Sequence, residues 1–244
     1  MRIFEIISPR TTVKKMSVPF DTARLKKQAA KSIQSVANAN LNAEKLPAVG
    51  SFGKGKVNPR DPHEFAKTSH LPVNLSADAY YQYVQAIAPY IQGNPYLPRI
   101  YAVNVKQDVS GQTKPTYKIE TLHEYSEFDE SVLMGLGERL FPGFEEVVMS
   151  KYSRPNGYVI WANIISRLSY LVVNGNVGSP WQDFGLPSES YVTQDKKLLQ
   201  AIELIKNLVS QNPNFFLDMS IRNAMLRGTP AGPQLVLSDP IANN

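Results

Sequence analysis

The spacing of apolar residues changes near residue 125, and this change constrains the fold more than any other feature of the sequence. Over 46–122, glycines and prolines separate short apolar segments that often alternate with polar residues, as is typical of strands and turns. Beyond residue 126, apolar residues recur at steps of three and four, which predicts helices over 129–141, 158–173 and 194–210. We therefore expect an α+β fold with a strand-rich first half and a helical second half.

Four further segments complete the expected order of elements. Helical spacing within the first half predicts helices over 22–40 and 76–92, the second with Ser76 as its N-cap. Residues 99–122 are expected to form a hairpin, because two alternating segments flank the turn-forming sequence DVSGQ. The tail, residues 215–240, predicts a second hairpin that turns at a Gly-Pro pair.

Charge separates an N-terminal extension from the remainder of the chain. The net charge is +5, yet residues 1–60 hold 12 Lys and Arg against 3 Asp and Glu, so the other residues are acidic on balance. We expect a basic extension over 1–45, a strand-rich part over 46–125 and a helical part over 126–244. The lysines of the predicted helix over 22–40 favour an anionic partner, with nucleic acid as one option.

The composition excludes several classes of protein. The chain has no cysteine, which excludes disulfides, thiolate zinc sites and a cysteine nucleophile. Its three histidines do not have the spacing of metal ligands. The longest apolar run, 158–173, is shorter than the roughly 20 residues of a membrane span, and residues 1–7 are too few for a signal core. We therefore expect no membrane association and a cytoplasmic location.

The tail carries the most informative motif. Asp218 and Asn223 form a D-x-x-x-x-N sequence, and Asp239 follows the apolar segment Leu235–Leu237. Phosphoryl transfer needs one carboxylate for the hydroxyl proton of the acceptor, and an amide oxygen and a second carboxylate for Mg²⁺. The predicted hairpin supplies these groups on one short segment. The alternative is turn chemistry, in which the same side chains bind neighbouring backbone groups.

These residues resemble those of the protein-kinase-like superfamily, in particular its atypical branch that includes aminoglycoside phosphotransferases. The sequence is also similar to small kinase-like proteins of tailed bacteriophages. The resemblance implies that Asp218 is catalytic, that Asn223 and Asp239 bind metal, and that the cofactors are ATP and Mg²⁺. It further implies a two-lobed fold, here in a minimal form, because only five residues follow Asp239 where an activation segment and further helices are usual.

The resemblance also assigns roles to residues of the first half. A glycine-rich hairpin would cover the nucleotide, a lysine on the next strand would bind its phosphates and act in catalysis, and a later connection would offer backbone groups to adenine. The nucleotide-binding positions implied in this way are Gly50, Gly53, Gly55, Lys67, Glu120 and Leu122.

Departures from the superfamily pattern leave more than one function open. Phe216 and Ser220 replace polar residues that are usual beside the catalytic aspartate, and the predicted helix over 76–92 contains no glutamate. One function is an ATP-dependent phosphotransferase of unknown acceptor. A second is a pseudokinase, a degenerate relative without catalysis, that engages a host protein if a phage encodes the chain. A third is binding of protein or nucleic acid through the basic extension.

A phosphate-binding P-loop is the alternative at the glycine cluster. The sequence GSFGKGKV nearly matches G-x-x-x-x-G-K-[ST]. However, Val57 replaces the hydroxyl residue, and Asn58-Pro59 follows where a P-loop requires a helix.

Overall fold

The computed structural model describes residues 53–58, 61–69, 74–107, 113–175 and 192–243. The predicted helix over 22–40, the rest of the basic extension and Gly50 lie outside the described residues. The nucleic-acid option that depends on the basic extension is therefore left as a prediction.

An antiparallel sheet is built from the first half of the chain. Its four strands are β1 (Gly53–Asn58), β2 (Asp61–Ser69), β3 (Ile100–Gln107) and β4 (Thr113–Glu120). They lie in the order β1-β2-β4-β3, and β3 and β4 form the hairpin expected over 99–122. Lys67 of β2 pairs with Gly55 on one side and Tyr117 on the other, so it lies on an inner strand. Because β1 leads into β2 and not into a helix, the P-loop alternative is wrong.

The second half of the chain contributes most of the described helices. Its elements are the 3₁₀ helix η2 (Tyr125–Glu127), α3 (Glu130–Leu140), α4 (Phe144–Lys151), α5 (Gly157–Asn174) and α6 (Lys196–Gln211). Within the described residues, the helix α2 (Ala79–Ile87) lies between β2 and β3. The side chains of Asn156 and Asp195 accept hydrogen bonds from backbone N–H groups in the first turns of α5 and α6, which explains where these helices begin.

The C-terminal residues form two short strand pairs. β5 (Phe215–Leu217) pairs with β8 (Ile241–Asn243), and β6 (Ala224–Arg227) pairs with β7 (Gln234–Leu237). The last strand is also tied to α2: the Asn243 side chain accepts a hydrogen bond from Ala79 N–H and donates one to Ala77 O, each at 2.7 Å.

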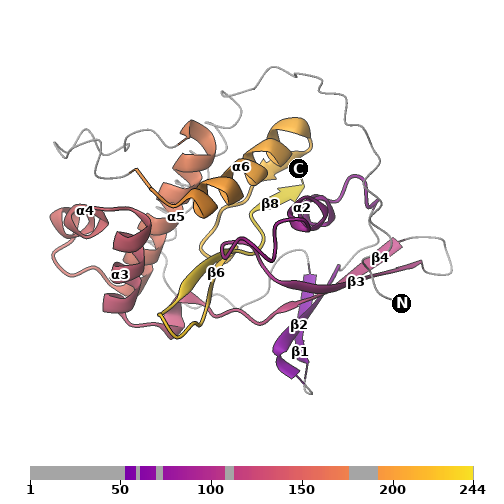
Figure 1. Cartoon of the computed structure of the whole chain (residues 1–244), viewed down its shortest axis with the longest axis horizontal. Helices are drawn as coiled ribbons and strands as arrows, with labels where there is room; N and C mark the ends of the chain where they lie inside the picture. The colour runs from indigo at the N-terminus through magenta and orange to yellow at the C-terminus, as the bar shows by residue number, and fades with distance from the viewer. Residues whose placement is uncertain (1–52, 59–60, 70–73, 108–112, 176–191, 244) are drawn as a thin grey trace.

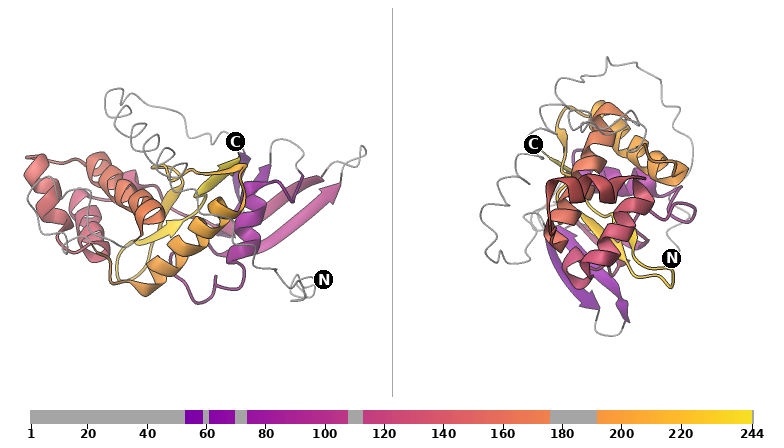
Figure 2. Two further views of the ribbon diagram at one scale, coloured as in Figure 1. Left: turned by 90° about the horizontal axis from the view of Figure 1, so that it is seen from above. Right: turned by 90° about the vertical axis from the view of Figure 1, so that its left-hand side faces the viewer.

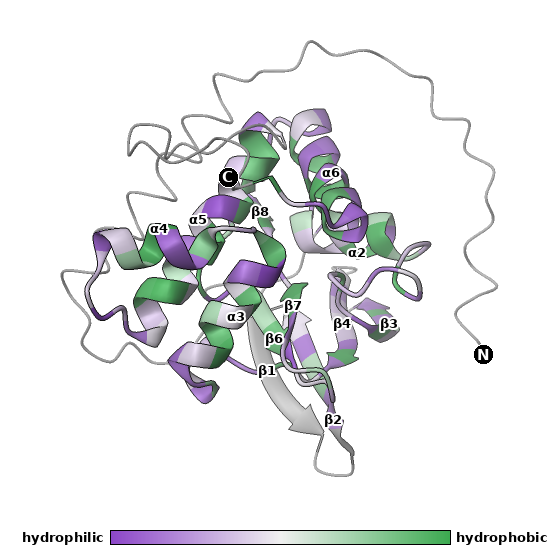
Figure 3. Cartoon of the chain, turned by 60° about the vertical axis from the view of Figure 1, so that its left-hand side comes forward, coloured by the Kyte–Doolittle hydropathy of each residue, from purple (hydrophilic) through white to green (hydrophobic). Residues whose placement is uncertain are grey.

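The sheet and the helices occupy opposite ends of the molecule. Strands β1 to β4 lie at one end and α3, α4 and α5 at the other, with α2, α6 and the C-terminal strands between them (Figure 1; Figure 2, left). Within this middle layer α2 packs against both α6 and β8. A continuous hydrophobic core runs from Tyr117 and Ile119 of the sheet to the fully buried Trp161 of α5. Figure 3 shows hydrophobic and hydrophilic residues on different sides of α6, as its apolar spacing predicts.

No helix in the described ranges combines the length and the apolarity that crossing a bilayer requires.

Several predictions of secondary structure are confirmed and others are corrected. Helices α3, α5 and α6 and the hairpin β6–β7 lie where they were expected. The N-cap of α2 is Asp78 and not Ser76, because the Asp78 carboxylate accepts the Tyr81 N–H while the Ser76 hydroxyl donates to Asn74. The sequence did not predict α4, or the pairing of β5 with β8.

The contact between α3 and α4 depends on a glycine. A Cβ atom added to Gly137 would lie 2.3 Å from the ring of the buried Phe144, whereas one added to Gly135 would meet nothing within 4 Å. We expect Gly137→Ala to lower the free energy of unfolding by about 1–3 kcal/mol because the core becomes overpacked. The matched variant Gly135→Ala should raise it by up to about 1 kcal/mol. Urea denaturation measures both, and equal effects would contradict this packing.

Candidate active site

Two loops that carry the predicted tail residues lie side by side. One connects β5 to β6 and holds Asp218 and Asn223, and the other connects β7 to β8 and holds Asp239. The Asn223 carbonyl accepts the N–H groups of Ser238 and Asp239, at 2.9 and 3.0 Å, and Asp218 N–H donates to Pro240 O at 2.9 Å. Backbone hydrogen bonds therefore bring together the three residues that the D-x-x-x-x-N motif and the following aspartate singled out.

The loop between β5 and β6 is held by one hydrogen bond within it and by another from α5. The Asn223 side chain donates from Nδ2 to the Asp218 carbonyl at 2.8 Å, which leaves its Oδ1 atom as the acceptor end of the amide. The indole Nε1 of the buried Trp161 donates to Ile221 O at 3.0 Å. These contacts fix the loop against α5, the longest of the described helices.

Lys67 joins this group from the opposite half of the chain. Its Nζ atom lies 2.5 Å from Asp239 Oδ2, although 172 positions separate the two residues. The Lys67 side chain is 20% exposed and that of Asp239 is 32% exposed. Partly buried pairs of this kind are screened by salt less than surface pairs. The structure thus brings together Lys67, Asp218, Asn223 and Asp239, all four of which were candidate site residues.

The surroundings of Asp218 raise the pKa of its carboxyl group. Burial raises the pKa of the Asp218 carboxyl above its ordinary value, and the charge of Asp239 raises it further. A hydrogen bond from Asn223 and the charge of Lys67 oppose this increase in the pKa. Since a higher pKa makes a carboxylate a stronger base, Asp218 is suited to accept a proton from a neighbouring group.

The oxygen atoms of the cluster suit a hard cation. The Asp239 carboxylate and the Asn223 Oδ1 atom are ligand types that Mg²⁺ prefers, with Asp218 beside them. Within the described ranges, no three His, Cys, Asp or Glu residues gather in a group able to hold a metal by themselves. A magnesium ion bound to Asn223 and Asp239 would therefore need further oxygen ligands from phosphate and water, as is usual for this ion.

The predicted nucleotide-binding glycines lie beside this cluster in a strand. Gly53 and Gly55 are both part of β1, and Gly55 is the direct cross-strand neighbour of Lys67. The family resemblance assigned these glycines to a hairpin, and β1 is the first strand of the antiparallel pair β1–β2. In a strand, glycine allows another group to approach the backbone closely.

The side chain of Glu120 is bound within the protein, whereas the role predicted for this residue concerns its backbone groups. Its carboxylate accepts hydrogen bonds from Arg227 Nε at 2.6 Å and Nη2 at 2.5 Å, and from the Arg99 N–H at 2.8 Å. The backbone N–H groups of Glu120 and Thr121 donate to other carbonyls of the protein. These two N–H groups are therefore already bound within the protein and are not offered to an adenine base.

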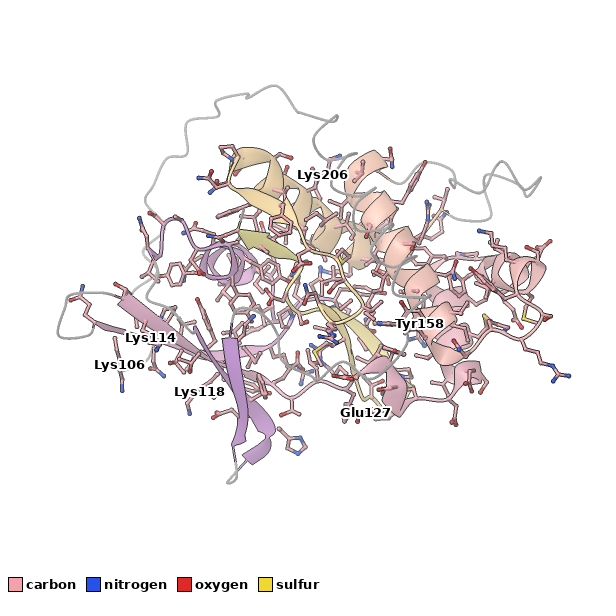
Figure 4. The ribbon with its side chains drawn as sticks, turned by 180° about the vertical axis from the view of Figure 1, so that it is seen from behind. Lys106, Lys114, Lys118, Glu127, Tyr158 and Lys206 are labelled. Atoms are coloured by element: carbon pink, nitrogen blue, oxygen red, sulfur yellow. The ribbon has the colours of Figure 1, made fainter. Side chains whose placement is uncertain are left out.

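Arg227 is a residue that the sequence analysis missed. Besides Glu120, its guanidinium binds the carbonyls of Pro95 and Leu97, at 2.8 and 3.1 Å. It therefore joins the C-terminal hairpin to the end of the sheet. No short motif could have indicated this, because its partners are 107 to 132 positions away. Lys106, Lys114 and Lys118 project from the sheet in Figure 4, and Lys118 contacts Glu64 at 3.0 Å.

Comparison with known proteins adds no family to this description. No protein-family model matches the chain, and a search of curated proteins finds no significant match. The functional class is therefore inferred from the arrangement of Lys67, Asp218, Asn223 and Asp239.

Proposed function

We propose that this protein binds ATP and Mg²⁺ in a kinase-like cleft and transfers the terminal phosphoryl group to an acceptor hydroxyl. One observation carries the proposal: Lys67 of the sheet contacts Asp239 of the C-terminal loop, beside Asp218 and Asn223. This set contains one cation, two carboxylates and one amide oxygen, which are the groups that phosphoryl transfer uses.

Each group has a role in the proposed reaction. Lys67 binds phosphate oxygens, and Asp239 and Asn223 hold Mg²⁺ against them. The acceptor oxygen attacks the terminal phosphorus, the bond to the bridging oxygen breaks, and ADP leaves with the bonding electrons. Asp218 accepts the proton of the hydroxyl group, a role that its raised pKa supports.

The order of elements supports a two-lobed kinase-like fold for this function. A glycine-containing strand precedes the strand of Lys67, a helix follows it, and a hairpin then leads into the helical part. A cytoplasmic site of action goes with this proposal, because ATP and Mg²⁺ are supplied there and a chain without cysteine needs no oxidising compartment.

Binding of ATP with Mg²⁺, measured by calorimetry and thermal shift, tests the proposal. ATP at 100 times its Kd should stabilise the folded protein by about 2.7 kcal/mol. We expect Lys67→Met and Asp239→Asn to abolish this effect, and Lys118→Met, which removes a lysine from the same sheet, to leave it unchanged. ATP binding that survives both site variants would refute the assignment.

A second candidate is a pseudokinase that binds nucleotide without transfer and engages a protein partner. It is favoured by the direct contact between Lys67 and Asp239, which neutralises the carboxylate proposed for Mg²⁺. Single-turnover assays with γ-labelled ATP separate the two candidates. Binding without release of ADP or labelled product, even into water, would favour the second.

A further inference from the structure

The ammonium group of Lys67 has an aromatic neighbour as well as an acidic one. Its Nζ atom lies 3.5 Å from the centroid of the Tyr80 ring, well within the roughly 6 Å over which a cation is attracted by the face of a ring. Tyr80 belongs to α2, whose sequence AYYQYVQAI contains no acidic residue. This helix therefore approaches the lysine with a ring and not with a carboxylate.

The Tyr80 ring is held firmly in this position. Only 9% of the residue is exposed, and Tyr117 meets its ring edge-on with centroids 4.8 Å apart. Tyr117 is itself the cross-strand partner of Lys67 in the sheet. The three side chains thus form one layer between α2 and strands β2 and β4.

The phenols of this layer are uncharged, and the nearby Asp78 carboxylate caps α2. Burial raises the pKa of both Tyr80 and Tyr117 well above the ordinary value, so both phenols remain neutral at physiological pH. Asp78, which precedes α2, caps the helix by accepting the Tyr81 N–H at 2.6 Å. Burial raises the pKa of Asp78, and the charge of Lys67 acts in the opposite direction.

We propose that Tyr80 is a positioning residue for Lys67 in nucleotide binding. The Tyr80 ring holds the Lys67 ammonium beside Asp239 without accepting a conventional hydrogen bond from it. N–H groups of Lys67 therefore stay available for phosphate oxygens. A carboxylate in the same place would accept an N–H and neutralise the charge. This inference rests on the proposed function, because it assigns Lys67 to the phosphates of ATP.

The test compares ATP with adenosine, which lacks phosphates. Calorimetry with Mg²⁺ is carried out on the wild type, Tyr80→Phe, Tyr80→Leu and the matched control Tyr81→Leu from the same helix. We expect Tyr80→Phe and Tyr81→Leu to bind ATP within threefold of the wild type. Tyr80→Leu should bind ATP about tenfold more weakly and adenosine equally well.

A spectroscopic measurement reports the contact without nucleotide. The ε-methylene NMR signals of Lys67, assigned by their loss in Lys67→Met, should be shifted by the ring in the wild type and Tyr80→Phe, and should return to ordinary positions in Tyr80→Leu. Circular dichroism checks folding, and Tyr80→Met replaces Tyr80→Leu if the leucine variant does not fold.

The outcomes separate this inference from the proposed function. A wild type that does not bind ATP overturns both. A wild type that binds ATP, with Tyr80→Leu unchanged, overturns the role of Tyr80 alone. Equal weakening of ATP and adenosine binding, or an unshifted Lys67 signal in the wild type, would also overturn it, since either result makes Tyr80 only a core residue.

Discussion

Replacement of Asp218 by asparagine is expected to lower the kcat of phosphoryl transfer by about 10²- to 10⁴-fold, the range typical of a lost general base. The affinity for ATP should stay within about threefold, because Lys67, Asn223 and Asp239 retain their contacts with phosphate and Mg²⁺ in the proposed complex. Turnover of labelled ATP and calorimetric binding, measured on the same preparation, provide the two quantities.

The pH dependence gives a second measure of the same residue. The Asp218 pKa is raised above the ordinary 3.8 by burial and by Asp239, and only the deprotonated carboxylate can accept a proton. In the wild type kcat/KM should therefore rise with pH and level off once the pH exceeds this raised pKa. In Asp218→Asn this limb of the profile should be absent.

Stability provides the control for Asp218→Asn. A carboxyl whose pKa is higher in the folded state binds its proton more tightly there than in the unfolded chain. The free energy of unfolding therefore falls as the pH rises from about 4 through the folded-state pKa. At pH 7 the asparagine variant should be at least as stable as the wild type by urea denaturation. An inactive variant that is also unfolded would not support a catalytic role, and a variant with full turnover would contradict it.

Removal of either partner of the Glu120–Arg227 pair should have the largest effect on stability. The two side chains are only 6% and 11% exposed, and they are joined by two hydrogen bonds. Glu120→Gln or Arg227→Met leaves a buried charge without its counter-ion, which typically costs about 3–5 kcal/mol. Arg227→Met also leaves the carbonyls of Pro95 and Leu97 without this donor. Urea denaturation of each variant measures the loss.

A second ion pair on the same strand supplies the control. Lys118 and Glu64 are 3.0 Å apart, but the lysine side chain is 42% exposed. Lys118→Met should therefore cost no more than about 1 kcal/mol. The double variant Glu120→Leu/Arg227→Met should be more stable than either single variant, because no lone charge remains buried. If Lys118→Met and Arg227→Met lower the free energy of unfolding by similar amounts, burial does not determine how much these ion pairs contribute to stability.

Local patterns were sufficient for much of the fold. Helix α6 was predicted because its apolar residues follow one face over four turns, and the hairpin β3–β4 because alternation surrounds turn-forming residues. The strand pair β5–β8 could not be predicted in this way, since three-residue strands far apart in sequence have no period to recognise. The start of α2 was misplaced because Ser76 and Asp78 are both good N-caps, and only the contacts of the folded chain distinguish them.

The residues of the candidate site also fall into two groups: those that local patterns predict, and those that depend on contacts between distant segments. Asp218, Asn223 and Asp239 could be selected from spacing alone, because a short hairpin keeps them together. The contact of Lys67 with Asp239 depends on how the sheet packs against the C-terminal loops, and the sequence indicated it only through a family resemblance. The ring of Tyr80 and the guanidinium of Arg227 had no signal of their own, since an apolar stripe and a lone arginine are common in any chain.

The two hydrogen bonds of the Asn243 side chain have a mechanical consequence. They fasten the start of α2 to β8, which follows Asp239 after a single proline, and α2 also packs on α6. A motion that separates the sheet from the C-terminal loops is therefore expected to leave α2 behind with those loops. In such a motion Tyr80 and Asp239 would keep their relative positions. Lys67 would move with the sheet and lose its contacts with both residues.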